Sequence, residues 1–170
     1  MRFAYQAFKS LKLCQNLFEF HGKQDQNKRT AIYFQFVEKK SAIMLSTDIA
    51  SRGIDFPAVD WVIQVDCPED MNTYIHRVGR TARYKSKGNA LMLLLPSELK
   101  FAEKLLQRNI HMKKMMGRSD RQLTIRPVLE KMNAENNELQ HLAKRACVSY
   151  LRGVHIMKDK DVFDVTKIDA

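Results

Sequence analysis

The chain has 170 residues, of which 45% are hydrophobic, six are glycine and four are proline. That length suits one domain with a core of its own, and the composition excludes a linker or a low-complexity chain. No apolar run reaches the roughly 18 residues that a membrane-spanning helix needs, so no membrane partner is predicted. The net charge of +10 favours a polyanionic partner such as nucleic acid, with a basic protein that binds none as the alternative.

Short apolar strands alternate with longer helices in the first part of the chain. Strands are expected at residues 16–20, 42–45, 61–65 and 90–95, and helices at residues 2–12, 26–40 and 71–83. Asp25 can cap the second helix with its side chain, and the apolar run at 90–95 is of the buried kind. This alternation is typical of a parallel sheet covered on both faces, whose ligands bind at the loops that follow the strands.

The pattern changes after Pro96 and predicts an all-helical extension. A helix is expected at residues 99–106 and a longer helical stretch at 126–157, with a basic, methionine-rich loop at 112–121. The apolar stripe of that stretch is expected to comprise Leu129, Met132, Leu139, Leu142, Ala143, Ala146, Val148 and Leu151. The sequence therefore predicts two parts, an α/β domain at residues 1–98 and a helical extension at 99–170.

Three arginines lie within seven residues near the end of the predicted helix at 71–83. Arg80 and Arg83 are three residues apart, so they are expected to point from one face of that helix, with Arg77 one turn earlier. Two guanidinium groups on one face suit a phosphate chain, because each can donate two parallel hydrogen bonds. An ordinary solvated basic helix face is the alternative interpretation.

A second polar segment follows the strand predicted at residues 42–45. Thr47 and Asp48 come first, followed by Arg52, Gly53 and Asp55. A hydroxyl, an arginine and a glycine that allows close backbone approach suit phosphate contacts, and a carboxylate can accept hydrogen bonds from ribose hydroxyls. A helix cap at Thr47 or Asp48 followed by an ordinary turn is the alternative.

These segments resemble sequence motifs of the DEAD-box RNA helicases. Residues 76–83 resemble motif VI, HRxGRxxR, at every fixed position, and residues 47–55 resemble motif V, TDxxxRGxD. Gln26 and Arg29 resemble the QxxR spacing of motif IVa, a weak signal alone that gains weight from its position before the other two. The resemblance implies a RecA-like parallel-sheet domain, the second of the two domains that form the motor of these enzymes.

The resemblance also implies a role for each matched residue. Arg80 and Arg83 would contact the triphosphate of ATP bound on the other RecA-like domain, with Arg83 as the arginine finger, and Asp55 would contact the nucleotide. His76 and Arg77 would couple the ATP and RNA sites. Contacts to the RNA backbone would come from Gln26, Arg29, Thr47, Asp48, Arg52 and Gly53.

Further stretches resemble one group of these helicases, which acts in the nucleolus on pre-rRNA. Residues 66–70, 147–152 and 157–165 carry this likeness, so that it covers essentially the whole chain. The resemblance implies an ATP-dependent RNA helicase of ribosome biogenesis, located in the nucleus and nucleolus. Its implied partners are pre-rRNA, the N-terminal RecA-like domain and ribosome assembly factors.

Half of the family's motor is absent from these 170 residues. There is no GxxxxGKS or GxxxxGKT loop and no Asp-Glu-Ala-Asp run, which in the family belong to the N-terminal domain that holds ATP and magnesium. The strand that carries motif IV would precede residue 2 and is also absent, so the domain is expected to be truncated and inactive alone. The alternative is a truncated, non-catalytic RNA-binding or regulatory module. No metal site is predicted, because the three cysteines are far apart.

Overall fold

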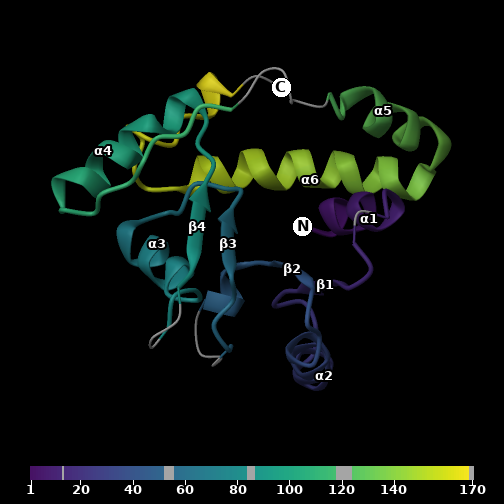
Figure 1. Ribbon diagram of the computed structural model, residues 1–170. Coiled ribbons are helices and arrows are strands. Elements are labelled where there is room, and N and C mark those ends of the chain that lie inside the picture. The colour runs from purple at the N-terminus through teal and green to yellow at the C-terminus, as the bar shows by residue number, and fades with distance from the viewer. Residues whose placement is uncertain (13, 52–55, 84–86, 118–123, 169–170) are drawn as a thin grey trace. The chain divides into compact units, whose positions relative to one another are not determined.

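The computed structural model describes the chain except for residues 13, 52–55, 84–86, 118–123 and 169–170. The described chain forms two compact units, Met1–Leu95 and Pro96–Ala170, whose elements are labelled in Figure 1. Each unit is described by itself.

The first unit is an α/β structure in which helices alternate with four short strands. Its elements are α1 (Arg2–Ser10), β1 (Leu17–Phe20), α2 (Gln26–Val37), β2 (Ile43–Ser46), the 3₁₀ helix η1 (Asp48–Ser51), β3 (Trp61–Gln64), α3 (Met71–Val78) and β4 (Asn89–Met92). β1 pairs with β2 and β3 pairs with β4, both in parallel. The predicted α/β class, the parallel pairing and the four strand positions are therefore confirmed.

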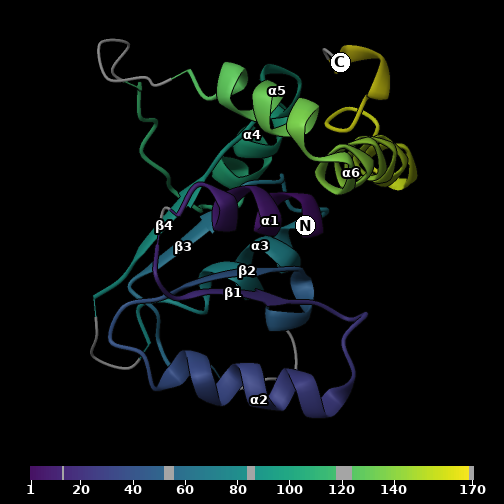
Figure 2. The same ribbon diagram turned by 90° about the vertical axis from the view of Figure 1, so that its right-hand side faces the viewer.

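The strands form two separate two-stranded sheets within the described residues. α1 and α2 pack on opposite sides of the β1–β2 sheet (Figure 2). Trp61 and Ile63 on β3 are 57% and 56% exposed, and β4 contains no buried residue. The prediction of a strand at 90–95 buried on both faces is therefore wrong. A two-stranded sheet has two edges and little width, so it cannot bury its strands as a wider parallel sheet does.

An aromatic cluster forms the core between α2 and β1. Phe20 is fully buried and meets Phe56, which is 3% exposed, edge to face at a centroid distance of 5.5 Å. Tyr33 and Phe36 of α2 contact the same Phe56 ring at 5.1 and 6.2 Å. Asp25 caps α2 as predicted, because its Oδ1 accepts a hydrogen bond from the Lys28 amide at 2.8 Å. This core fixes the loops that follow β1 and β2.

α3 ends at Val78, five residues before the predicted end at residue 83. Gly79 closes the helix, and Thr81 then forms a parallel bridge with Val59. Ala82 has a φ of 52°, which is incompatible with a continuing right-handed helix. Arg80 and Arg83 therefore do not share a helix face, and the prediction that they do is wrong.

The second unit is helical, as predicted for the extension. Its elements are η2 (Pro96–Glu98), α4 (Leu99–Gln107), α5 (Arg126–Glu135), α6 (Asn137–Ile156) and η4 (Val165–Lys167). Its most buried apolar side chains are Phe101, Leu105, Leu139, Leu142, Val154, Val162 and Phe163. No helix in the described part of the chain is both long and apolar enough to cross a membrane.

One residue of the predicted apolar stripe faces solvent. Val148 is 58% exposed, whereas Leu139 on the same helix is 3% exposed. Nine residues at about 100° each place Val148 on the opposite side of α6 from Leu139. The inclusion of Val148 in the apolar stripe was therefore wrong.

Candidate functional site

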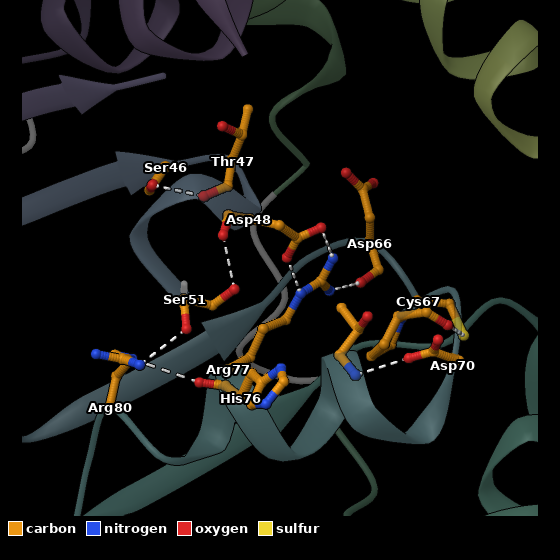
Figure 3. A network of polar contacts seen from close by, with 12 residues as sticks. Ser46, Thr47, Asp48, Ser51, Asp66, Cys67, Asp70, His76, Arg77 and Arg80 are labelled. Carbon is orange, nitrogen blue, oxygen red and sulfur yellow. Dashed lines mark hydrogen bonds and ion pairs between the residues drawn. The ribbon is translucent and has the colours of Figure 1, made fainter. Parts of the chain in front are cut away.

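The candidate site lies where η1, the end of β3 and α3 meet, within the first unit. η1 follows β2 directly, and its contacts with α3 bring residues 48–51 against residues 76–80. These are the two segments that the sequence singled out for phosphate chemistry. Figure 3 shows their side chains and the polar contacts between them.

Asp48 and Arg77 form the central ion pair of the site. Arg77 Nε donates to Asp48 Oδ1 at 2.6 Å, and Arg77 Nη2 donates to Asp48 Oδ2 at 3.0 Å. The third nitrogen, Nη1, donates to the Asp66 carbonyl at 2.8 Å. The Arg77 side chain is only 19% exposed and that of Asp48 is 43% exposed. One guanidinium group thus ties together η1, the segment after β3 and α3 (Figure 3).

Arg80 is held against the end of η1. Its Nη2 donates to the Ser51 carbonyl at 2.8 Å, and its Nε donates to the His76 carbonyl at 3.5 Å. Ser51 is 5% exposed and its hydroxyl donates to the Asp48 carbonyl at 2.7 Å. Ser51 thereby fixes the turn that receives Arg80. Sequence reasoning missed Ser51.

Arg83 is held between two segments. Its Nε donates to the Gly79 carbonyl at 2.8 Å, and its Nη1 donates to the Phe56 carbonyl at 2.8 Å. Arg80 thus bonds Ser51, just before residues 52–55, and Arg83 bonds Phe56, just after them. The candidates Arg52, Gly53 and Asp55 lie outside the described residues.

Thr81 fixes the backbone between these two arginines. Its hydroxyl donates to the Val59 carbonyl, and the Val59 amide donates to the Arg80 carbonyl at 3.0 Å. A Cβ on Gly88 would lie 2.0 Å from Thr81 Oγ1. Only glycine, which has no side chain, therefore lets the backbone come this close to Thr81. Sequence reasoning missed both Gly88 and Thr81, whose partner Val59 lies 22 residues earlier in the chain.

Thr47 lies beside the ion pair at the carboxyl end of β2. The residue is exposed, and its amide donates to the Phe20 carbonyl at 3.2 Å. His76, on the exposed side of α3, contributes its carbonyl to the contact with Arg80. Burial raises the pKa of the neighbouring Tyr74 above its usual value.

Gln26 and Arg29 form a pair in the first turn of α2. Arg29 Nη2 donates to Gln26 Oε1 at 2.6 Å. The loop before them is held by Gln24, which is 7% exposed and bonds both the His21 amide at 3.0 Å and the Glu19 carbonyl at 3.1 Å. Sequence reasoning missed Gln24. Because Phe20 and Ser46 are partners in parallel strands, the Gln26 pair and Thr47 follow the same edge of one sheet.

The site offers cationic and hydroxyl groups rather than a metal cage. In the part of the chain that the structure describes, no three His, Cys, Asp or Glu side chains gather to hold a metal ion. Guanidinium, hydroxyl and backbone N–H groups are the usual ligands of phosphate oxygens. The arrangement can therefore bind polyphosphates or a nucleic-acid backbone.

Two protein-family models match the sequence. Residues 3–85 match the helicase conserved C-terminal domain, and residues 136–170 match the C-terminal extension of ATP-dependent rRNA helicases of the SPB4-like type. The chain belongs to the DEAD-box RNA helicase family. It is 46% identical over 168 residues to the probable ATP-dependent RNA helicase DDX10 of Homo sapiens, and 44% identical to the ATP-dependent RNA helicase dbp4 of Schizosaccharomyces pombe.

The chain spans about a fifth of the length of these relatives. Each alignment covers 99% of this chain but only 19% of the human protein and 23% of the yeast protein. The family assignment expected from the sequence is confirmed.

Solved structures of DEAD-box proteins share the fold. Mss116p bound to single-stranded RNA and AMP-PNP matches with a TM-score of 0.74 and 29% identity, over 96% of this chain and 32% of that one. Domain 2 of Mss116p bound to an RNA duplex matches with a TM-score of 0.73 and 26% identity, over 98% of this chain and 65% of that one. These neighbours confirm the RecA-like fold class.

Proposed function

We propose that this chain forms the second motor domain of an ATP-dependent RNA helicase that remodels RNA during ribosome biogenesis. The relatives are named as ATP-dependent RNA helicases, and the matching extension model is named for an rRNA helicase. Pre-rRNA is the proposed substrate, the nucleolus the proposed location, and ribosome assembly factors the further partners. The N-terminal RecA-like domain is the partner that completes the motor.

The observation that carries the proposal is the bidentate pair between Asp48 and Arg77. Asp48 belongs to the segment proposed to contact RNA, and Arg77 belongs to the segment that carries Arg80. The pair joins η1 to α3 directly and is largely buried on the arginine side, so we propose that it couples a displacement of η1 to α3. His76 joins the same link through its carbonyl bond to Arg80.

The arginines of the site fit a triphosphate by the chemistry of their donors. Arg80 and Arg83 each direct two N–H groups to backbone carbonyls. A phosphate group carries negative charge and can accept two parallel bonds from one guanidinium group, so phosphate is a better acceptor for these donors than a neutral carbonyl. ATP would supply the phosphoryl group, Arg83 would stabilise the charge that develops on it, and Asp55 would contact the nucleotide. Magnesium would be held by the N-terminal domain.

RNA is proposed to bind along the edge that follows β1 and β2. Gln26 and Arg29 follow the first of these strands, while Thr47, Asp48, Arg52 and Gly53 follow the second. Contacts of these types go to phosphates and sugars, so binding is expected to be independent of base sequence. The solved neighbours named above were bound to single-stranded and duplex RNA, which supports this proposal.

RNA-stimulated ATP hydrolysis tests the arginine-finger role. The chain is joined to the N-terminal RecA-like domain of the human relative, and turnover is measured with saturating RNA. Arg83→Ala is expected to lower kcat by about a thousandfold, the usual effect of losing an arginine finger. Arg2→Ala, which removes an exposed arginine of α1, is the matched control and is expected to keep full turnover. Equal kcat values for the two variants would refute the role of Arg83.

Salt-dependent RNA binding tests the backbone contacts. Arg29→Ala is expected to weaken binding equally for RNAs of different sequence and to flatten the plot of log affinity against log salt by about 0.7, as the loss of one phosphate contact does. Arg2→Ala has the same charge change and is expected to leave the slope unchanged. A loss of affinity confined to one RNA sequence contradicts backbone recognition.

A non-catalytic RNA-binding module is the second candidate function. The absence of a GxxxxGKS or GxxxxGKT loop from these 170 residues favours it for the chain alone. We expect no RNA-stimulated ATP hydrolysis from the purified chain, because an arginine finger acts only on a nucleotide that another group holds. Turnover above background in a highly purified sample refutes that expectation. A joined protein that binds RNA but never hydrolyses ATP would favour the module.

A further inference from the structure

The turn between β1 and α2 is closed by the side chain of Gln24. Its Nε2 donates to the Glu19 carbonyl at 3.1 Å, and its Oε1 accepts from the His21 amide at 3.0 Å. The Gln24 amide in turn donates to the His21 carbonyl at 3.1 Å. Gln24 is buried, so water competes little for these bonds. Through its carboxamide, Gln24 is therefore hydrogen-bonded to the residues on both sides of Phe20, the last residue of β1.

Phe20 also holds the segment that follows β2. Its carbonyl accepts a hydrogen bond from the Thr47 amide at 3.2 Å, and Thr47 is one of the proposed RNA contacts. A Cβ on Gly22 would lie 3.8 Å from Ile49 Cδ1, an ordinary contact distance, so the loop after β1 lies beside η1. The turn that Gln24 closes is therefore next to both of the segments that are proposed to contact RNA.

The aromatic cluster around Phe56 holds β1 and α2 together independently of Gln24. Phe20 of β1 and Tyr33 of α2 both contact the Phe56 ring, at centroid distances of 5.5 and 5.1 Å. The turn between the two elements, residues 21–25, contains no apolar side chain that could anchor it in this core. Its conformation therefore depends on the hydrogen bonds of Gln24 and on the side-chain cap of α2.

We propose that Gln24 is a positioning residue for RNA binding. It sets where Gln26 and Arg29 lie relative to Thr47 before RNA binds, and it is buried and does not contact RNA itself. A turn that is already ordered loses less conformational entropy when RNA binds, so its order raises the affinity. This inference rests on the proposed function, because the RNA contacts of both segments are part of that proposal.

A role in the fold alone is the other interpretation of Gln24, and the two roles differ in what they predict for RNA affinity. If Gln24 acts through Arg29, the replacement of Gln24 has a smaller effect once the Arg29 side chain is gone. If Gln24 serves the fold alone, its replacement lowers the free energy of unfolding but leaves the RNA affinity of the folded chain unchanged. A double-mutant cycle on RNA affinity therefore separates the two roles.

The test variant is Gln24→Met, in which a side chain of similar length loses both hydrogen bonds without a change of charge. Gln24→Asn is a milder second variant, because it keeps the carboxamide but is shorter by one methylene. Gln15→Met and Gln15→Asn are the matched controls, since Gln15 is exposed and precedes β1, at the other end of the strand from Gln24. All variants are made in the full chain, with and without Arg29→Ala, and circular dichroism verifies that they fold.

The readout is the affinity for a fluorescent single-stranded RNA over a series of salt concentrations. Gln24→Met is expected to weaken binding about tenfold. It is expected to leave the slope of log affinity against log salt unchanged, because it removes no phosphate contact. In the Arg29→Ala background the same replacement is expected to weaken binding about threefold or less. Gln24→Asn is expected to act in the same direction with a smaller effect, and the Gln15 variants are expected to match the unmodified chain.

Each outcome of these measurements decides the inference. Equal RNA affinities for the folded Gln24 and Gln15 variants overturn it, and so does an equal loss of affinity with and without Arg29. Unfolding of both Gln24 variants also overturns it, because Gln24 would then serve the fold. In each of these cases a normal effect of Arg29→Ala leaves the proposed function standing. A chain that binds no RNA, or an Arg29→Ala variant with unchanged affinity and slope, refutes the proposed RNA contacts and, with them, this inference.

Discussion

Asp48 and Arg77 form one ion pair, but we expect their replacement to lower the free energy of unfolding by different amounts. In Asp48→Asn the shape is kept, but the charge is lost and an amide N–H₂ faces a guanidinium nitrogen. Arg77 is only 19% exposed, so water cannot replace the lost acceptor, and we expect a loss of about 2 kcal/mol in unfolding free energy, typical of a hydrogen bond to a charged group. In Arg77→Gln the stranded carboxylate of Asp48 is 43% exposed and regains water, so we expect about 1 kcal/mol.

A double-mutant cycle measures this difference directly. Trp61 is the only tryptophan in the chain and lies on β3, so its fluorescence during urea unfolding reports on the unit that contains the pair. The two single variants and the double variant are expected to give a coupling energy of about 1 kcal/mol. Coupling below about 0.3 kcal/mol would refute the inference that this pair links the two segments.

Three further predictions concern the backbone and the strand edges. Gly88→Ala is expected to destabilise the first unit by at least ~2 kcal/mol in urea unfolding, because its Cβ would lie 2.0 Å from Thr81 Oγ1 and 2.4 Å from the Ala82 nitrogen. Gly153→Ala is expected to stabilise α6 by about 1 kcal/mol in hydrogen exchange, because no atom lies within 4 Å of the added methyl; unchanged exchange rates contradict this. In the described chain β2 and β3 each pair with a single strand, so we expect concentration-dependent association in sedimentation velocity, and a monomer at all concentrations contradicts it.

Local signals in the sequence were sufficient to predict most of the fold. The cap at Asp25 and the four strand positions depend on residues within a few positions of one another, and the structure confirms them. The end of α3 depends instead on Val59, which accepts the hydroxyl of Thr81 from 22 residues away. Helix periodicity does not contain that contact, so the helix was predicted to continue to residue 83. Val148 was misplaced for a different reason, since a hydrophobic residue in a helical stretch was assumed to face inward.

The candidate site was predicted as two sets of residues, but the contacts between them could not be predicted. Motif spacing identified Asp48, Arg77, Arg80 and Arg83, and each of these residues is engaged across a separation of 27 to 29 positions. These contacts explain why the two segments must be present together. Arg77 fixes the distance between η1 and α3. Arg80 and Arg83 donate hydrogen bonds to neutral backbone carbonyls, those of Ser51 and Phe56, on either side of residues 52–55. A phosphate chain that replaces those carbonyls would free Ser51 and Phe56 from the two arginines, and we propose that the Asp48–Arg77 pair carries the change toward the edge proposed for RNA.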